Sequence, residues 1–241
     1  MNHHDVQTAL RSYIDPAKAA FYPRFFKTGP GQYGEGDQFL GITVPNIRTA
    51  IKPYHTLPLD EVALLLASKW HEDRLAALLI LVWQYSHGDA RERTLIYEFY
   101  LTQTTYINNW DLVDTSCRDI VGWHIYDHPE LQSQLDTLAA SDSLWERRIA
   151  MVSTFYFLMY SDPEPTLRIA TALIHDRHDL MQKAVGWMLR ELGKRVDPAL
   201  LVDFLREHYS HTGRTALRYA IEHFPAHIRA RYLRGDFTPH A

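Results

Sequence analysis

The chain has 241 residues, 46% of them hydrophobic and 22% charged, a balance typical of an ordinary globular protein with a generous core. Its formal charge of -4 does not indicate a nucleic-acid binder, although residues 143–241 carry 14 Lys and Arg against 11 Asp and Glu and so permit contact with phosphate. The longest apolar run, residues 75–85, is too short to span a membrane. The length permits one elongated domain or two small ones, and we expect a single domain over residues 1–241. No signal peptide is evident and the single cysteine, Cys117, excludes an internal disulfide, so we expect a cytoplasmic protein.

Almost every segment has the residue spacing of an amphipathic helix, and none shows the alternation of a half-buried strand. Aspartates stand where N-caps belong and prolines where first turns belong. The pattern predicts a helix over 5–14, a second that starts at Asp15-Pro16, and others over 45–53, 60–70, 72–87, 90–104, 110–126, 129–140, 143–160, 164–176, 179–195, 198–210, 213–223 and 226–234. The expected N-caps are Asp60, Asp89, Asp162, Asp179 and Asp197, and the expected first-turn prolines are Pro129, Pro163 and Pro198.

The only substantial loop, residues 28–41, is rich in glycine. It contains Gly29, Gly31 and Gly34 in the spacing of a dinucleotide-binding fingerprint. That motif requires a strand before the loop, whereas helix precedes it here and no βαβ unit is predicted. We therefore reject nucleotide binding by this loop.

Three of the predicted helices share a short pattern: an acid or amide, then a base, then a small residue three positions on. The pattern occurs at residues 72–77, 145–150 and 181–186. This spacing is close to a repeat of 36 residues in which the second repeat lacks the pattern, and residues 109–110 fall near the start of that second repeat. Helix pairs at this period indicate an all-α solenoid of HEAT-like repeats, in which equivalent helices line one concave face.

The segment that begins at Asn109 combines an aromatic ring with a carboxylate. Asn109 suits a helix cap, and Trp110 and Asp114 lie four residues apart, so that they neighbour each other on a helix. A buried carboxylate beside an indole is costly unless it has a partner or a task. The simpler interpretation is that Asp114 pairs with Arg118 on a solvated face.

The repeat places Asp114, Arg148 and Trp187 on successive equivalent helices, near the same depth from each start, with Arg190 one turn beyond Trp187. One concave strip would then hold a carboxylate, two indoles and two guanidinium groups. Each residue alone has an ordinary alternative, because a Trp can fill a core and an Arg can sit on a solvated surface. We interpret the five together as a site.

The fourteen histidines invite a metal hypothesis. His124 and His128 are spaced i, i+4 beside Asp127, and His223 and His227 have the same spacing. A metal site needs a third convergent ligand, and no HExxH or CxxC motif supplies one. We therefore expect no metal and no cofactor.

These residues resemble those of the AlkD-type DNA alkylation-repair glycosylases, a bacterial family built of HEAT-like repeats. The stretches that carry the resemblance are residues 110–114, 142–148 and 182–191, together with the loop 33–42, and the likeness extends over nearly the whole chain. Family members remove N3- and N7-alkylated purines from DNA. The resemblance implies double-stranded DNA containing alkylated purines as the partner, no membrane association, and a monomer.

The resemblance also implies a role for each site residue. Asp114 would be the catalytic carboxylate, Trp110 and Trp187 would flank the lesion, and Arg148 and Arg190 would hold the DNA backbone. The remaining residues implied in DNA binding are Lys183, Arg147 and Phe25. Phe25 departs from the family pattern, because it stands where the family has a Tyr near the lesion. Lys183 occupies the basic repeat position, so we interpret it as a phosphate or structural lysine and expect a monofunctional enzyme without lyase activity.

These residue types suit the chemistry. An N-alkylated purine is cationic and leaves its sugar as a neutral base, so that no general acid is needed. An anionic carboxylate can stabilise the developing oxocarbenium ion, and indole rings attract the cation. Two other hypotheses stay open: a non-catalytic HEAT-repeat scaffold, and a protein that binds unusual DNA structures without cutting them.

Overall fold

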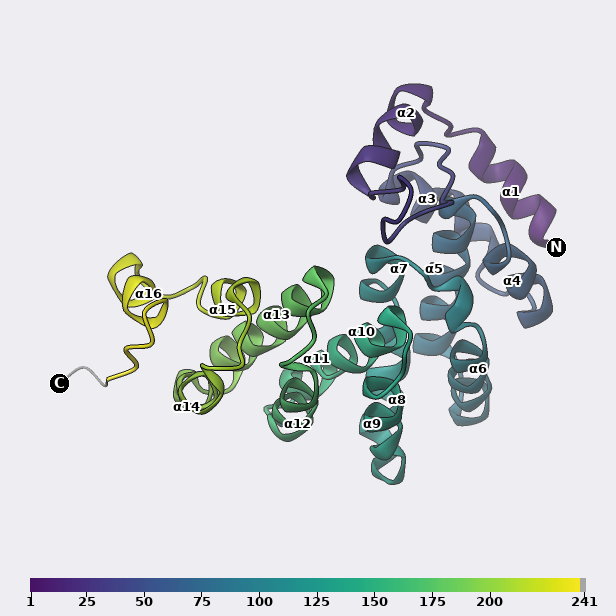
Figure 1. Cartoon of the computed structure of the whole chain (residues 1–241). Coiled ribbons are helices and arrows are strands. Elements are labelled where there is room, and N and C mark those ends of the chain that lie inside the picture. Colours follow the sequence, from purple (N-terminus) through teal and green to yellow (C-terminus); the bar gives the residue numbers. More distant parts are fainter. Residues whose placement is uncertain (239–241) are drawn as a thin grey trace. The chain divides into compact units, whose positions relative to one another are not determined.

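The computed structural model describes residues 1–238, and these fold into helices joined by short connections, without a β-strand among them. The chain divides into two compact units, and the boundary falls between Ile120 and Val121. The helices of unit 1 are α1 (His3–Arg11), α2 (Pro16–Phe25), α3 (Val44–Ile51), α4 (Leu59–Leu66), α5 (His71–His87), α6 (Ala90–Thr102) and α7 (Trp110–Asp114) (Figure 1). The helices of unit 2 are α8 (Trp123–Asp127), α9 (Ser133–Ala139), α10 (Leu144–Ser153), α11 (Phe155–Met159), α12 (Glu164–Leu173), α13 (Asp179–Arg195), α14 (Pro198–His208), α15 (Arg214–Ala220) and α16 (Ala226–Tyr232). The expected all-α fold is confirmed, whereas the single domain over 1–241 stays a prediction.

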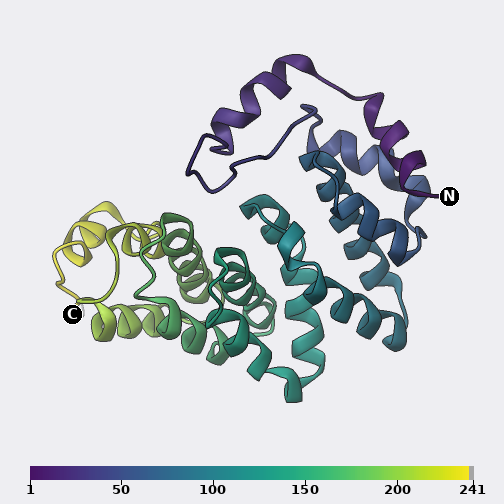
Figure 2. The ribbon, with the colours of Figure 1, turned by 45° about the vertical axis from the view of Figure 1, so that its right-hand side comes forward.

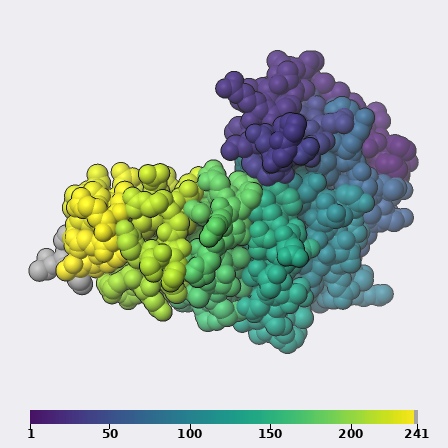
Figure 3. Space-filling model, viewed as in Figure 1, coloured from purple at the N-terminus to yellow at the C-terminus, as the bar shows by residue number. Residues whose placement is uncertain are grey.

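Helix α5 is the core of unit 1. Residues 75–81 are buried on every face of the helix, because α3, α4, α6 and α7 all pack against it. A helix that is apolar all round is stable only when it is covered in this way. Helix α2 differs, since none of its residues is buried. It lies with the following loop at the surface of unit 1, in the darkest purple of Figure 3.

Helix α13 has the same central place in unit 2, where it contacts α10, α11, α12, α14 and α15. The small residue of its repeat pattern explains the close approach of α15. A Cβ atom at Gly186 would lie 2.4 Å from the Ala216 carbonyl oxygen, so any larger residue would push the two helices apart. The equivalent helices α10 and α13 pack directly against each other, as the repeat predicts.

The repeat is also visible in side-chain hydrogen bonds. In unit 1 the Ser68 hydroxyl donates to Asp73 at 2.8 Å, and Arg74 donates to the Ser68 carbonyl at 3.0 Å. In unit 2 the same two bonds recur among Ser141, Glu146 and Arg147. Each set closes the turn that leads into its helix. The acid and the base of the sequence pattern therefore have a structural task in both units.

Three of the expected helices are interrupted, and the one predicted over 129–140 is a 3-10 turn, Pro129–Leu131, followed by α9. The predicted helix 110–126 ends at Asp114, continues as a π-helical turn over Arg118–Gly122, and resumes as α8. At the break the Thr115 and Ser116 hydroxyls donate to the carbonyls of Asp111 and Leu112, at 2.7 and 2.6 Å. Hydroxyls that bond backward in this way compete with the backbone ladder and bend a helix.

The predicted helix 143–160 is interrupted for the same reason. It breaks at Thr154, whose hydroxyl donates to the Met151 carbonyl at 2.8 Å. In the sequence, the helical spacing of apolar residues continues through both breaks. The sequence pattern therefore does not reveal them.

The caps agree with the prediction where the aspartate directly precedes the helix. Asp15, Asp89 and Asp197 each accept a hydrogen bond from the backbone of the first turn. Asp60 and Asp179 were expected as caps but lie inside the first turn, after Pro58 and His178. The cap residue of α12 is Pro163 instead of Asp162. These corrections shift each helix start by one or two residues.

Figure 2 shows the loop between α2 and α3 as a ribbon without helix over most of its length. The loop ends at a tightly packed glycine. Gly41 has φ +80°, and a Cβ there would lie 2.1 Å from the Asp15 carbonyl oxygen. Gly31, in the same loop, has a similar φ of +73° but nothing within 4 Å of a Cβ. A substitution at Gly31 therefore tests backbone strain alone, whereas a substitution at Gly41 tests the same strain together with a steric clash.

We expect Gly41→Ala to lower the free energy of unfolding by roughly 3 kcal/mol or more, because it adds a severe clash to left-handed strain. Gly31→Ala should cost only about 1 kcal/mol, since it suffers the strain alone. Urea denaturation of both variants measures the difference. Equal losses would show that the loop moves freely away from Asp15.

Candidate functional site

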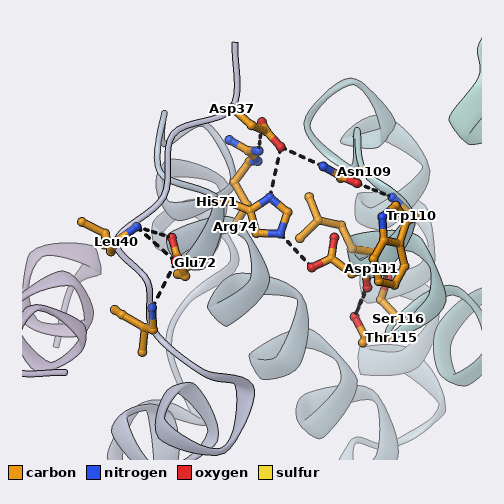
Figure 4. Close-up of polar contacts among 12 residues, drawn as sticks. Asp37, Leu40, His71, Glu72, Arg74, Asn109, Trp110, Asp111, Thr115 and Ser116 are labelled. Carbon is orange, nitrogen blue, oxygen red and sulfur yellow. Dashed lines mark hydrogen bonds and ion pairs between the residues drawn. The ribbon is translucent and has the colours of Figure 1, made fainter. Parts of the chain in front are cut away.

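The site in unit 1 starts from four consecutive polar residues at the beginning of α5: His71, Glu72, Asp73 and Arg74. All four are at most 4% exposed. The Glu72 carboxylate accepts hydrogen bonds from the backbone N–H groups of residues 40–42, at 2.8 to 3.2 Å (Figure 4). Asp73 receives two bonds from the Arg11 guanidinium, at 2.6 and 2.9 Å. Charges at this depth are tolerated only when they are paired in this way.

His71 connects the glycine-rich loop to α7. Its Nδ1 donates to Asp37 at 3.1 Å and its Nε2 donates to Asp111 at 2.7 Å (Figure 4). Asp37 also pairs with Arg74. Burial by itself lowers the pKa of His71, but the carboxylates of Asp111 and Asp37 outweigh it and raise the pKa to about 9. The imidazole is therefore a cation at neutral pH.

The start of α7 is fixed at a second point. The Asn109 side chain donates to Asp37 at 3.0 Å and accepts from the Trp110 backbone N–H at 2.8 Å, which confirms Asn109 as the cap of α7. Since α7 ends at Asp114, Trp110 and Asp114 are its first and last residues, and both are half-buried. Arg118, the expected partner in the simpler interpretation of Asp114, makes a two-pronged pair with Asp119, at 2.7 Å for each bond.

Aromatic rings surround Trp110. The Phe26 ring stacks on it with centroids 5.5 Å apart, and the Phe25 ring meets it edge-on at 5.9 Å. Phe25 is 53% exposed, so one face of this cluster is open to solvent. A phenyl ring at this position contacts the indole but offers no hydroxyl to a ligand.

Unit 2 holds the predicted arginines of α10, and both have internal partners. Arg147 pairs with Asp176 at 2.8 Å and donates to the carbonyls of Ser141 and Asp142. Arg148 is 4% exposed and donates to the Leu180 carbonyl at 2.7 Å. These bonds fasten α10 to the segment that starts α13. A phosphate would have to compete with them, and the DNA role of both arginines stays a prediction.

The predicted residues of α13 are more accessible. Trp187 is half-buried, with its ring 6.3 Å from that of Phe155. Arg190 pairs with Glu222 and Glu191, and its buried Nε has no hydrogen-bond partner among the described residues. Lys183 pairs with Asp179 at 2.8 Å. Trp187 and Arg190 thus come from one helix, as the sequence predicts.

The structure brings the predicted residues together in two groups. Trp110, Asp114 and Phe25 belong to unit 1, and the other predicted residues belong to α10 and α13 of unit 2. Sequence reasoning missed the link that His71 makes between Asp37 and Asp111. A signal was present, because four polar residues in a row begin a helix whose following residues, 75–81, are all apolar.

Residues 1–238 hold neither a ready-made metal site nor a membrane-spanning helix. No group of three or more His, Cys, Asp and Glu side chains within that range is arranged to hold a metal ion, and the expectation of no metal stays a prediction. None of the helices in the same range has the length and apolar character needed to cross a membrane.

The fold and the site define a helical-repeat protein with a carboxylate and an indole on one short helix. The chain belongs to the DNA alkylation repair enzyme family, whose family model matches residues 6–224. In fold it is similar to a predicted DNA alkylation repair enzyme from Enterococcus faecalis, with a TM-score of 0.69 and 17% identity over 88% of this chain and 97% of that one. The curated proteins include no match to this sequence. The expected helical-repeat solenoid class is confirmed, and the family supports a role in the repair of alkylated DNA.

The charge on His71 predicts how stability depends on pH. Because the folded pKa of about 9 lies above the ordinary value of 6.5, the stabilisation is complete below about pH 6.5 and is lost as the pH rises through about 9. The wild-type protein should therefore be more stable than His71→Gln at low pH. The difference in their free energies of unfolding should be about 3 kcal/mol larger near pH 6.5 than above pH 9. Urea denaturation across this range tests the expectation. A difference that does not change with pH would mean that His71 is neutral in the folded protein.

Proposed function

We propose that this protein is a DNA glycosylase that hydrolyses the N-glycosidic bond of cationic N3- and N7-alkylated purines, such as 3-methyladenine and 7-methylguanine. The observation that carries the proposal is α7, a helix of a single turn whose two ends are an indole and a carboxylate. The contacts of Asn109 and Asp111 with Asp37 and His71 hold this helix in place. Family membership supports DNA as the substrate.

The chemistry requires little beyond a well-placed negative charge. The alkylated purine departs as a neutral base and takes the electron pair of the glycosidic bond. The sugar is left as an oxocarbenium ion, which water attacks, and the proton of that water goes to solvent or to the carboxylate. Asp114 stabilises the positive sugar electrostatically and orients the attacking water.

The indoles favour a damaged base over a normal one. A cation above an indole ring gains on the order of 0.5–2 kcal/mol, which a neutral purine does not gain to the same degree. Trp110 supplies such a ring from unit 1, and Trp187 supplies one from unit 2. Phe25 extends the aromatic surface beside Trp110.

Arg190 and Lys183 contact phosphate oxygens and position the DNA without reading its sequence. Arg147 and Arg148 support them by fixing the start of α13 through their internal bonds. The Lys183 amine is engaged by the Asp179 carboxylate, which supports a structural or phosphate-binding role for Lys183 and a monofunctional enzyme. We propose a cytoplasmic monomer without a cofactor.

The first test removes the negative charge at Asp114. Asp114→Asn should release free base from a 7-methylguanine duplex at least about 100-fold more slowly than wild type, because electrostatic stabilisation of this kind is worth about two to three powers of ten. Binding to the same duplex should remain. Base release under single-turnover conditions and a binding titration measure both properties.

Asp60→Asn is the matched control, because Asp60 is an exposed aspartate in the first turn of α4. It should behave like wild type. Equal release by Asp114→Asn and wild type would remove Asp114 from the chemistry. No release by wild type would favour the scaffold or the non-cutting DNA binder.

The second test concerns Trp187. Trp187→Ala should slow release of cationic 7-methylguanine roughly 2- to 30-fold, the range that corresponds to the lost attraction between cation and ring. Trp123→Ala is the control, since Trp123 is also half-buried in unit 2 but stacks on Tyr156. A rate for Trp187→Ala that matches this control would place Trp187 outside the site.

A further inference from the structure

Two adjoining cavities lie in unit 1 at the C-terminal end of α5. The larger, of about 380 Å³, lies between the turn before α4, the end of α5 and the start of α6. The smaller, of about 260 Å³, lies between α3 and α5. Both are lined by His55 and Trp83, so the two cavities share a wall. Trp83 follows His71 on α5 by about 18 Å along the helix axis, so these cavities are separate from the candidate site at α7.

The smaller cavity carries positive charge. Arg48 is in the last turn of α3 and Lys52 directly follows that helix, so the two side chains leave from the same face. Both are exposed, and neither makes a hydrogen bond or an ion pair with any residue in the described part of the chain. No Asp or Glu among the described residues lines this cavity. Guanidinium and ammonium groups bind phosphate in many proteins, so we expect the smaller cavity to attract a phosphate.

The wall that the two cavities share is a stack of aromatic side chains. The imidazoles of His55 and His87 lie nearly parallel to the Trp83 indole, with ring centroids 4.3 and 4.0 Å from it. Burial and the neighbouring His87 lower the pKa of His55, so its imidazole is neutral at pH 7. A neutral imidazole offers one donor and one acceptor, and the ring nitrogens of His55 bond to no other residue of the described chain.

The larger cavity is mainly apolar and contains a fixed polar group. Leu57, Leu95 and Ile96 line it beside the indole. Gln84 also lines it, and its Nε2 donates to the carbonyls of His55 and Leu57, at 2.8 Å for each bond. These two bonds use both N–H groups and fix the amide, while Oε1 accepts from no residue within 1–238. An apolar cavity of this size with a few fixed polar groups is typical of small-molecule sites.

We propose that the two cavities together bind a phosphorylated heteroaromatic compound, of which a nucleoside monophosphate is a simple example. The phosphate lies in the smaller cavity against Arg48 and Lys52. The flat ring lies in the larger cavity, where an N–H of the ring donates to Gln84 Oε1. The inference goes beyond the proposed function, because this site takes no part in cleavage of the glycosidic bond.

The test compares adenosine 5′-monophosphate with its two halves, adenosine and inorganic phosphate. Each is titrated into the intact protein by calorimetry at low ionic strength, which limits screening of the cations. Adenosine 5′-monophosphate should bind at least about 10-fold more tightly than either half, because it alone fills both cavities. Affinity for either half equal to that for the nucleotide, or no binding of the nucleotide, would overturn the inference.

Single variants locate the nucleotide in the two cavities. Arg48→Gln and Lys52→Gln should each weaken binding of the nucleotide roughly 2- to 10-fold and leave binding of adenosine unchanged, since each removes a phosphate contact. Both side chains are exposed, so folding is at little risk. Leu95→Ala should weaken binding of adenosine and of the nucleotide alike, because it removes an apolar contact with the ring.

Lys69→Gln is the charge-matched control, because Lys69 is exposed and lines neither cavity. It should bind the nucleotide like wild type. Unchanged affinity for the nucleotide in both Arg48→Gln and Lys52→Gln would place the phosphate elsewhere and overturn the inference.

A DNA arm distinguishes a free phosphate compound from the phosphodiester backbone. Saturating, undamaged duplex DNA should leave binding of adenosine 5′-monophosphate unchanged. Displacement of the nucleotide by the duplex would assign Arg48 and Lys52 to the DNA backbone and overturn the inference. Arg48→Gln should release 7-methylguanine at the wild-type rate. Failure of the glycosylase assay would refute the proposed function alone, since the nucleotide titrations do not depend on it.

Discussion

The site in unit 1 depends on four charged side chains buried in a row at the start of α5. Moving one charge out of water costs several kcal/mol, and only a partner of good geometry repays that cost. Each of the four finds its partner on a different segment: α1, the glycine-rich loop, α7, or the turn before α5. The chain can satisfy all four only by bringing these segments to one place. The position of the site residues therefore follows from an electrostatic requirement at the end of one helix.

This requirement reaches α7 through a single carboxylate. A helix of one turn has little stability of its own, because nucleation costs more than its few hydrogen bonds return. Helix α7 persists since Asp111 pairs with His71 and Asn109 with Asp37. These two contacts fix the rotation of α7 about its axis. They thereby determine which way Trp110 and Asp114 face, although neither residue takes part in the contacts.

The features that are local in the sequence could be predicted. The extent of α13, the caps Asp89 and Asp197, and the repeated pattern depend on neighbours within a few residues, and all were read correctly. The link from Asp37 through His71 to Asp111 could not be predicted, because its members lie 34 and 40 residues apart. The break after Asp114 was missed for another reason. Thr115 and Ser116 are compatible with a helix by propensity, and only their bonds to the preceding turn reveal the bend.

The arginines of unit 2 match the residues implied in DNA binding, but the match does not tell which of them is available to a phosphate. Arg147 pairs with an aspartate that is 12% exposed, so that replacing this partner by a phosphate would leave a buried carboxylate without its cation. Arg190 pairs with Glu222, which is 55% exposed and can return to water at little cost, and with the buried Glu191, which keeps a second cation in Arg195. An arginine is available to DNA when its protein partner is easily solvated. By this criterion Arg190 can exchange the carboxylate of Glu222 for a phosphate more easily than Arg147 or the buried Arg148 can leave their internal partners, and the DNA role of those two stays a prediction.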